Sequence, residues 1–561
     1  MGTNKISIIY TTLFFILLTS FMFAQAEYVP YSHPVYNFLE RMDSRHILAD
    51  YNNFELPKTR KAIAFYIKEI ISRQSEINKV DKGILEDLKN EFEFELYGTL
   101  NHTASLLGAD GYNFFSEKEK YFYHLADSSK AAIFINIPVD FESIINHNSE
   151  TGQNFSAGFI RWGGVIRGTL LNKFGFYMKG SNAFFKGEKS IARNINELKF
   201  NYKFNGDKKA LTATNYFDNS EGYITADFDL ISFKLGRDQR KIGYSSFKNI
   251  LDVNTPPFDY LSFDMKYKAI SFSYFHGKML GVSQISNDPV QGEINTISDK
   301  YVGYHRLGVN LSKDITFGAG ELIVYSRRSF DPAYVNPFNF YKSTEHANQD
   351  RDNSMLFFDF TNNSIKSLKF YGTVLIDDID FGKLGTGWYG NQLCYNFSIF
   401  SSGLYDVLPV DLTFQYLRIE PYVYTHRILD NNFTSSGYSL ADPLQPNSDV
   451  FNVGFNYNPH YRVRLALEFS YTRHGANELN PDGNVRRNVG GDVLVGYRAG
   501  DDTKVKFLDG IREDYRTLSV SGVFEPVRNY FLSAKVIYEN SRPQLLQNNY
   551  FAGYLIMNLR I

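Results

Sequence analysis

The sequence predicts an all-β protein, a transmembrane antiparallel β-barrel that follows a small N-terminal α-helical bundle. Three observations predict this: an export signal at the start, a helical period of apolar residues to about residue 98, and a period of two from about residue 131. The composition fits a barrel, because 16% of the 561 residues are aromatic, with 50 Phe and 40 Tyr. A mean hydropathy of −0.30 with 21% charged residues excludes a helical membrane protein.

Residues 1–26 have the three parts of a secretory signal peptide. Lys5 is the only charge before Glu27, an apolar stretch follows it, and Ala24-Gln25-Ala26 fits a cleavage site. An uncleaved anchor helix is the alternative. No later stretch reaches the roughly 18 apolar residues of a spanning helix. The exported chain is therefore expected to be either soluble or a barrel in the outer membrane of a diderm bacterium.

The pattern of residues 27–130 predicts a periplasmic helical region and a linker. Between residues 58 and 74 the apolar residues recur at the spacing of one helix face, and Thr59 is a candidate N-cap. Further helices are expected over residues 35–42 and from Asp81 onward. Together these patterns predict a bundle of about three helices, each of which buries one face.

Residues 131–561 alternate between apolar and polar side chains in runs of about ten. One such run has apolar Val463, Leu465, Leu467, Phe469 and Tyr471, separated by residues that include Arg464, Glu468 and Ser470. Runs of this kind are typical of outer-membrane strands, whose apolar face contacts lipid and whose polar face lines the lumen. The length suits about 18 strands, and roughly 16 is also possible.

A soluble β-sandwich or propeller is the alternative for this region, since its strands also alternate. No fixed-period repeat of the kind that a propeller requires is present. The chain also closes on an alternating run that begins at Phe551, as a barrel does, although it ends on Ile561 rather than on an aromatic residue.

Charge and cysteine content exclude several classes of protein. Lys and Arg number 59 against 61 Asp and Glu, so the basic excess of a nucleic-acid-binding protein is absent. A single cysteine, Cys394, excludes an intramolecular disulfide framework and a Cys-rich zinc site. The expected partners are outer-membrane lipid and a surface polysaccharide, with the oligomeric state left open.

No motif for catalysis or cofactor binding stands out. The sequence lacks G-x-S-x-G, H-E-x-x-H and a P-loop, so we expect no enzyme, no catalytic residue and no cofactor. Oxygen-bearing side chains gather between Glu345 and Asn353, but their spacing does not match a Ca²⁺-binding EF-hand loop. A solvated loop is the preferred interpretation, and no metal site is predicted.

A ladder of tyrosines and charges is the first candidate for sugar binding. The run is residues 416–426. If it alternates as a lipid-facing strand, Leu417 and Ile419 contact lipid and the polar residues that alternate with them face the lumen. The lumenal set is Tyr416, Arg418, Glu420, Tyr422, Tyr424 and His426. Aromatic rings stack on sugar faces, and charged groups hydrogen-bond to hydroxyl groups. An Arg418–Glu420 network that braces the strands is the alternative, and the pattern alone favours it slightly.

A second candidate lies at the end of a strand that begins near Ile231. Arg237 and Asp238 occur there, and Arg240 and Lys241 follow, so this strand end could face an acidic polymer. Lumenal pairing with acids is an equally good interpretation. The segment 254–259 contains two prolines and cannot be a central strand, so it is either a loop folded into the lumen or a plain turn.

Several segments resemble the Wzi family of capsule-assembly outer-membrane proteins. The matching motifs include Ser32-His33-Pro34, Leu235-Gly236-Arg237-Asp238, Asn254-Thr255-Pro256-Pro257, Tyr304-His305-Arg306-Leu307, Gly320-Glu321, Asn336-Pro337-Phe338 and Arg418-Ile419-Glu420-Pro421. They occur in family order and cover most of the mature chain. Two features depart from the family: Lys241-Ile242 stands where members usually carry Trp, and the terminal residue is Ile561.

The resemblance implies an 18-stranded barrel, a periplasmic helical bundle, an inward carboxylate at Glu321 and a lectin-like, non-catalytic role. We therefore expect a protein for surface attachment or assembly of capsular or related polysaccharide. Its candidate binding residues are Arg237, Asp238, Glu321, Arg418, Glu420, Tyr422 and Tyr424. The alternative is an outer-membrane diffusion channel, which would need no helical plug.

Overall fold

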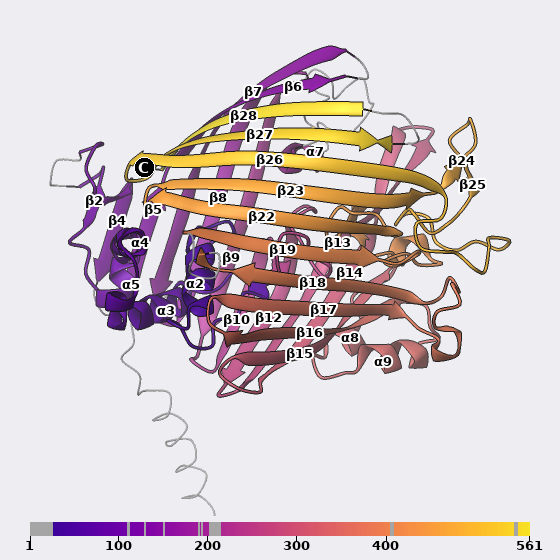
Figure 1. Ribbon diagram of the computed structural model, residues 1–561, viewed down its shortest axis with the longest axis horizontal. Coiled ribbons are helices and arrows are strands. Elements are labelled where there is room, and N and C mark those ends of the chain that lie inside the picture. Colours follow the sequence, from indigo (N-terminus) through magenta and orange to yellow (C-terminus); the bar gives the residue numbers. More distant parts are fainter. Residues whose placement is uncertain are drawn as a thin grey trace, which may run out of the picture.

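The computed structural model describes residues 26–108, 113–127, 131–149, 152–188, 191, 195–200, 215–403, 409–543 and 548–560. Most of the predicted leader, residues 1–25, and the terminal Ile561 lie outside the described residues. The described chain forms a closed antiparallel barrel of 18 strands, which confirms the predicted fold class (Figure 1).

The barrel strands follow one another in chain order around the ring. The first is made of β5 (Ala131–Asn136) and β6 (Pro138–Asn148), which both pair with β7. The next are β7 (Gln153–Leu170), β8 (Phe174–Gly187), β9 (Tyr216–Asp227), β10 (Ile231–Asp238), β12 (Phe258–Tyr267), β13 (Ile270–Asp288), β14 (Gly292–Asn310), β15 (Ile315–Ser326) and β16 (Asn353–Ile365). The last are β17 (Leu368–Asp378), β18 (Gln392–Ser401), β19 (Val410–Ile419), β22 (Ser448–His460), β23 (Val463–Ala476), β26 (Ile511–Val527), β27 (Tyr530–Arg542) and β28 (Asn548–Arg560). Pairing of β28 with β6 closes the ring.

Shorter elements lie at the two ends and inside. The strands are β1 (Glu55–Leu56), β2 (Thr103–Ser105), β3 (Glu119–Tyr121), β4 (Tyr123–Asp127), β11 (Lys241–Ile242), β20 (Thr434–Ser435), β21 (Tyr438–Ser439), β24 (Glu478–Leu479) and β25 (Val485–Arg487). The helices are α2 (Val35–Ser44), α3 (Arg60–Ser72), α4 (Lys79–Glu91), α5 (Glu93–Tyr97), α7 (Asn196–Lys199), α8 (Pro332–Val335) and α9 (Tyr341–Ala347), with 3₁₀ turns η1 (Gln74–Glu76), η3 (Phe381–Lys383) and η4 (Leu429–Asn431). None of the described helices is long and apolar enough to cross a membrane.

The outer wall carries an apolar belt. On β23 the outward residues Leu465, Leu467 and Phe469 are 40–44% exposed, as expected for side chains that contact lipid. Short turns join the strands at the end where the N-terminal helices lie, and the long loops 327–352, 420–447 and 477–510 lie at the other end (Figure 1). Because barrels of this class have short periplasmic turns and longer extracellular loops, we infer that the helices lie at the periplasmic end.

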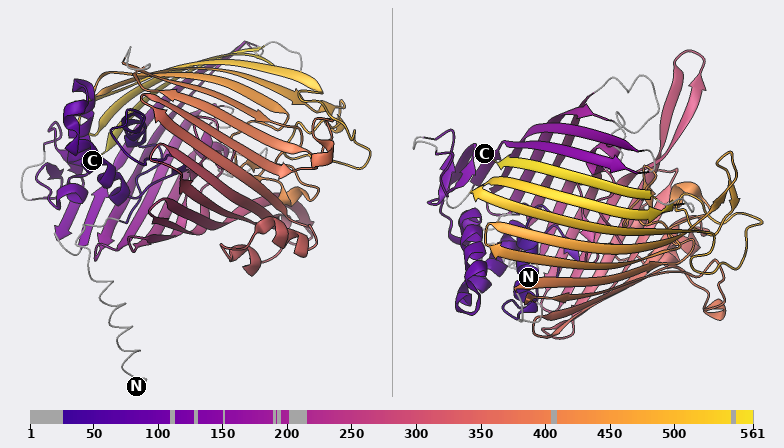
Figure 2. Two further views of the ribbon diagram at one scale, coloured as in Figure 1. Left: turned by 60° about the horizontal axis from the view of Figure 1, so that its bottom comes forward. Right: turned by 45° about the horizontal axis from the view of Figure 1, so that its top comes forward.

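The three predicted N-terminal helices are confirmed as α2, α3 and α4, and α5 is an additional one. The Thr59 hydroxyl accepts a hydrogen bond from the Ala62 amide at 3.2 Å, so it caps α3 as predicted. Figure 2 shows these helices gathered at one end of the barrel. A cluster of buried apolar residues, including Leu39, Ile63, Ile67 and Leu85, holds them together.

Buried ion pairs join this helical plug to the wall. The Lys369 ammonium on β17 lies 2.7 Å from an Asp43 carboxylate oxygen and 3.0 Å from a Glu40 oxygen, both on α2. Arg41 reaches Asp411 of β19 at 3.2 Å. Removing one partner of such a pair leaves an unneutralised buried charge, so these contacts fix the plug in place.

The middle of the lumen is filled by the chain that connects β10 to β12. Residues 239–257 turn inward, β11 pairs with β1 of the plug, and Tyr244 and Leu251 enter a large apolar core. Inward residues of the wall, such as Tyr304 and Leu417, complete this core. The Pro-Pro segment therefore belongs to a loop folded into the lumen, one of the two alternatives, and strand structure resumes at Phe258.

Candidate functional site

The extracellular end is covered by three loops, residues 379–391, 420–447 and 477–510, which we call the cap (Figure 1). The cap is anchored from below by Tyr424, a fully buried residue whose hydroxyl donates to the Asn249 carbonyl at 2.7 Å. The backbone amide of the same residue donates to an Asp377 oxygen at 2.6 Å. Tyr424, a predicted binding residue, thus joins the cap to the core and offers no surface to a ligand.

Aromatic rings from all three cap loops meet around Tyr422. The rings of Tyr389 and Tyr497 stack with centroids 3.6 Å apart and planes within 10°. Tyr422 packs edge-on against both, at 5.9 and 6.0 Å, and its hydroxyl donates to the Asn488 carbonyl at 3.1 Å. Trp388 adjoins Tyr389 at 5.4 Å. We call these four residues the cap cluster; Tyr422 is buried and the other three are partly exposed.

Charged groups surround the cap cluster and are paired with one another. The Arg498 guanidinium lies 2.8 Å from an Asp501 oxygen, and the Asn488 amide donates to the same carboxylate at 2.8 Å. Partial burial raises the pKa of Asp501, but hydrogen bonds from Arg498 and Asn488 lower it by more, so the pKa lies below its ordinary value. The Lys383 ammonium lies 3.9 Å from the Trp388 ring centroid. The arrangement combines partly exposed aromatic surface with hydrogen-bonding groups, as sugar recognition requires.

Arg418 and Tyr416 are on the opposite face of β19 from the one predicted. Leu417 and Ile419 point inward and are fully buried in the lumenal core, so Tyr416 and Arg418 point outward. The predicted orientation of β19 was wrong because apolar side chains fill the lumen here, so the inner face of the strand is apolar instead of polar. Arg418 lies 2.5 Å from Glu420 and 3.8 Å from the Phe507 ring centroid. Burial raises the pKa of Glu420, and Arg418 opposes that rise.

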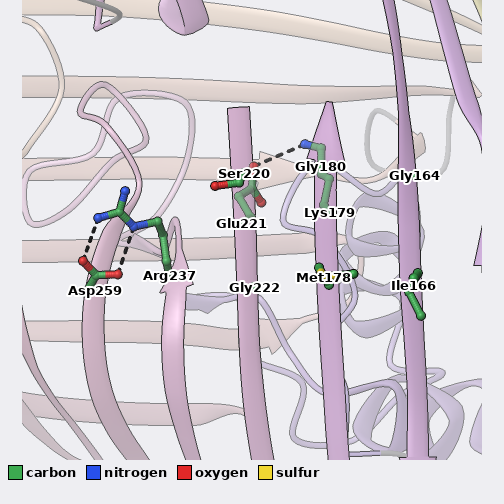
Figure 3. A pocket seen from close by; sticks show the side chains of 10 residues that line it. All are labelled: Gly164, Ile166, Met178, Lys179, Gly180, Ser220, Glu221, Gly222, Arg237 and Asp259. Atoms are coloured by element: carbon green, nitrogen blue, oxygen red, sulfur yellow. Dashed lines mark hydrogen bonds and ion pairs between the residues drawn. The ribbon is translucent and has the colours of Figure 1, made fainter. Parts of the chain in front are cut away.

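Arg237 also points outward, beside a hollow in the outer wall. Its guanidinium forms a bidentate ion pair with the Asp259 carboxylate, with N–O distances of 2.9 and 2.6 Å (Figure 3). The hollow measures about 560 Å³, and Met178 and Gly180 are among the residues that line it. Asp238, the next residue, points inward and is held by Lys234 and the Tyr260 hydroxyl.

Glu321 was expected to point into the lumen, and that prediction was wrong. Its neighbour Leu322 enters the lumenal core, so Glu321 points outward, where α9 covers it. Its carboxylate accepts the backbone amides of Tyr341 and Lys342 at 2.8 and 3.2 Å and lies 3.0 Å from His305. Glu321 therefore fixes the start of α9 against the outer wall.

The seven predicted binding residues do not form one site. Four lie at or below the cap, two lie at the end of β10 on opposite faces, and one lies under α9. Trp388, Tyr389 and Tyr497 were not among the predicted binding residues, because they come from two loops about 110 residues apart and no periodicity relates them. Within the described ranges, no group of three or more His, Cys, Asp or Glu side chains is arranged to hold a metal ion.

No family model and no curated protein matches the chain. Among solved structures the chain is similar to Wzi of Escherichia coli, described as an outer-membrane protein involved in group 1 capsule assembly and a carbohydrate-binding β-barrel. The TM-score is 0.56 at 10% identity, over 95% of this chain and 99% of that one. OpdQ and OccK8 (OprE) of Pseudomonas aeruginosa give TM-scores of 0.41 and 0.43 at 9% and 11% identity, over 78% and 76% of this chain and 99% and 98% of theirs. At these identities the likeness to Wzi extends to the fold alone.

Proposed function

We propose that this protein is a non-catalytic outer-membrane barrel that attaches a surface polysaccharide, capsular or related, through its cap. The observation that carries the proposal is the blocking of the lumen. The plug is joined to the wall at Lys369 of β17 and at Arg528 of the turn between β26 and β27, and the inward loop 239–257 and the anchored cap fill the half of the lumen that β12 to β19 line. A wall closed in this way supports binding at the outer surface rather than diffusion through the centre.

The cap supplies chemistry that suits a carbohydrate. Partly exposed rings of Trp388, Tyr389 and Tyr497 offer apolar surface, and neighbouring Arg, Asp and Asn groups offer hydrogen bonds. Each barrel needs to hold a polymer only weakly, because a long polymer meets many barrels at once. The fold likeness to a barrel described as carbohydrate-binding supports the same proposal.

The test measures how much surface glycan stays with the cells when the cap cluster is disrupted. In a strain that carries only the Tyr389→Ala/Tyr497→Ala variant, we expect glycan to move from the cell pellet to the medium while total glycan is unchanged. Tyr97→Ala is the matched control, because Tyr97 is 49% exposed at the opposite, periplasmic end. Unchanged retention, with the variant folded and present in the membrane, would contradict the proposal.

Conductance tests the alternative class of function. The wild-type protein in a planar bilayer should be electrically silent, because the plug is joined to both sides of the wall across one end of the lumen. A protein that conducts openly, in steps that small sugars block, would favour a diffusion channel instead. This outcome is independent of the glycan assay, so the two functions can be told apart.

A further inference from the structure

A row of alternating charges crosses five neighbouring strands on the outside of the barrel. Arg418 of β19 pairs in register with Asp449 of β22, Asp449 with Arg473 of β23, Arg473 with Asp514 of β26, and Asp514 with Arg542 of β27. All five residues are on the outward face of the wall, the same face as the exposed apolar residues of these strands. We call this row the outer ladder.

The acids of the outer ladder lie behind its cations. Asp449 is fully buried, because the Arg473 guanidinium grips both of its oxygens and the Tyr416 hydroxyl donates to one at 3.2 Å. Asp514 accepts from Arg512 at 2.9 Å and from the Tyr471 hydroxyl at 3.0 Å. The cationic side chains remain partly exposed: those of Arg418, Arg473 and Arg512 are 33%, 30% and 36% exposed.

Cations are in excess on this surface. Besides Arg512, the exposed Arg516 lies one outward position below Asp514, with its guanidinium 5.4 Å from the Tyr471 ring. The cations are Arg418, Arg473, Arg512, Arg516 and Arg542, and the acids are Asp449, Asp514 and Glu420. Five positive groups therefore face three negative ones, and the negative ones are the less exposed.

The outward residues nearer the middle of the same strands show how deep in the membrane the outer ladder lies. The next outward row contains the aromatic Tyr416, Phe451 and Tyr471 and continues into Arg516 and Asn540, and the two rows after it are almost wholly apolar. Those apolar rows are Phe414, Val453, Phe469, Leu518 and Tyr538, then Leu412, Phe455, Leu467, Val520 and Val536. A change from apolar through aromatic to charged side chains marks the boundary between hydrocarbon and headgroups. Arginine costs about 2–4 kcal/mol at the bilayer centre and about 0–1 near this boundary.

A shorter row of the same kind occurs on the other side of the barrel. Arg237 pairs in register with Asp259, and Asp259 with Lys278, whose ammonium lies 2.8 Å from Asp299. This row adjoins the hollow in the outer wall (Figure 3). Charged rows at the top of the belt therefore occur on two arcs of the wall, and the outer ladder is the one with a cation excess.

We propose that the outer ladder binds the phosphate groups of phosphorylated glycolipids in the outer leaflet. A guanidinium group can bind two phosphate oxygens at once, and the less exposed acids beside Arg418, Arg473 and Arg512 hold these side chains in fixed positions. The ligand is membrane lipid, distinct from the polysaccharide that the cap is proposed to hold. Bound lipid would form a collar around β19 to β27 beneath the cap.

The test compares lipid binding by two variants of the full mature chain in detergent micelles. Arg516→Gln/Arg542→Gln removes two exposed cations, Arg542 of the outer ladder and Arg516 of the outward row next to it. Arg486→Gln/Lys506→Gln removes two exposed cations of the cap instead. The probe is a diphosphorylated glucosamine-based glycolipid, with its dephosphorylated form and phosphatidylcholine as comparisons, and binding is measured by native mass spectrometry.

The ladder variant should bind the diphosphorylated glycolipid about 5- to 30-fold more weakly than wild type, at roughly 1 kcal/mol per cation near an anionic surface. The cap variant should bind it within twofold of wild type. Equal binding of the dephosphorylated form, or equal loss in both variants, would overturn the proposal. So would ladder-dependent binding of inorganic phosphate or of an acidic polysaccharide without binding of the glycolipid. Retained resistance to heat in SDS shows that both variants are folded.

Discussion

The two halves of the barrel wall differ in what their inner faces contact. On β12 to β19 the inward residues Tyr304, Phe357 and Leu417 are fully buried against the loops and the plug. On β23 to β27 the inward residues Glu468, Ser519 and Lys535 are polar; the first two are partly exposed and Lys535 is exposed, and no apolar core of the described residues includes them. The same alternating pattern therefore has opposite meaning in the two halves.

The difference shows what a period of two can and cannot predict. Alternation follows from strand geometry, in which successive side chains point to opposite faces, so it identifies strands in both halves. The surroundings of each face, whether lipid, water or protein core, decide which type of residue that face carries. Where the lumen is filled, the inner face becomes a protein core, and outward charges such as Arg418 mark the headgroup level instead.

The largest effect is expected from a charge on the inner face of the filled half. Leu417→Asp places an unpaired carboxylate in the apolar core, which should lower the free energy of unfolding by about 4 kcal/mol or prevent folding. Ala466→Asp, at an inward position of β23, should change it by less than about 1 kcal/mol, because this face is polar. Urea unfolding in micelles, followed by circular dichroism, measures both. Equal losses would mean that the two inner faces are equivalent.

A smaller effect is expected where the plug meets the filled half. Lys369→Met leaves Glu40 and Asp43 buried without their cation, at a cost of about 3–5 kcal/mol, part of which the plug can relieve by moving. We therefore expect faster proteolysis of the helices in this variant, with the barrel still intact. Lys535→Met in the polar half is the control and should leave the proteolysis rate unchanged. Comparable protection of the plug in both variants would show that these ion pairs do not hold it.

Much of the fold was predictable because it depends on local patterns. The three helices follow from apolar spacing and the Thr59 cap, and the strand count follows from length and alternation. The positions of Arg418 and Glu321 were not predictable in the same way. Both depend on what covers a face of the wall, which is a loop or a helix distant in sequence: Phe507 over Arg418, and α9 over Glu321.

The candidate site was less predictable than the fold for the same reason. Tyr422 was identified from a run of alternating residues, and it does lie in the cap cluster. Tyr389 and Tyr497, which stack on each other, lie in irregular loops where no period applies. Isolated aromatic residues within otherwise polar, Gly-containing loops were the only signal, and that signal becomes specific only once the loops are placed together.

The smallest predicted effect concerns the plug's contact with the polar half, through Asp87 on α4. Burial raises the pKa of Asp87 to about 6, although Arg528, at the turn between β26 and β27, opposes that rise. Between its ordinary pKa near 4 and about 6, the folded protein therefore binds a proton that the unfolded chain does not. This contribution to stability is present at low pH and is lost as pH rises through that window.

Asp87→Asn removes this titration. The stability of wild type relative to the variant should fall by about 1–3 kcal/mol between pH 4 and pH 6.5, and stay level above that, as the shift in the pKa implies. Parallel thermal unfolding curves of the two proteins across this range measure the difference and cancel the other titrating groups. A difference that rises with pH would mean that Arg528 holds the carboxylate charged, and that the plug is fixed to both halves of the wall by the same kind of ion pair.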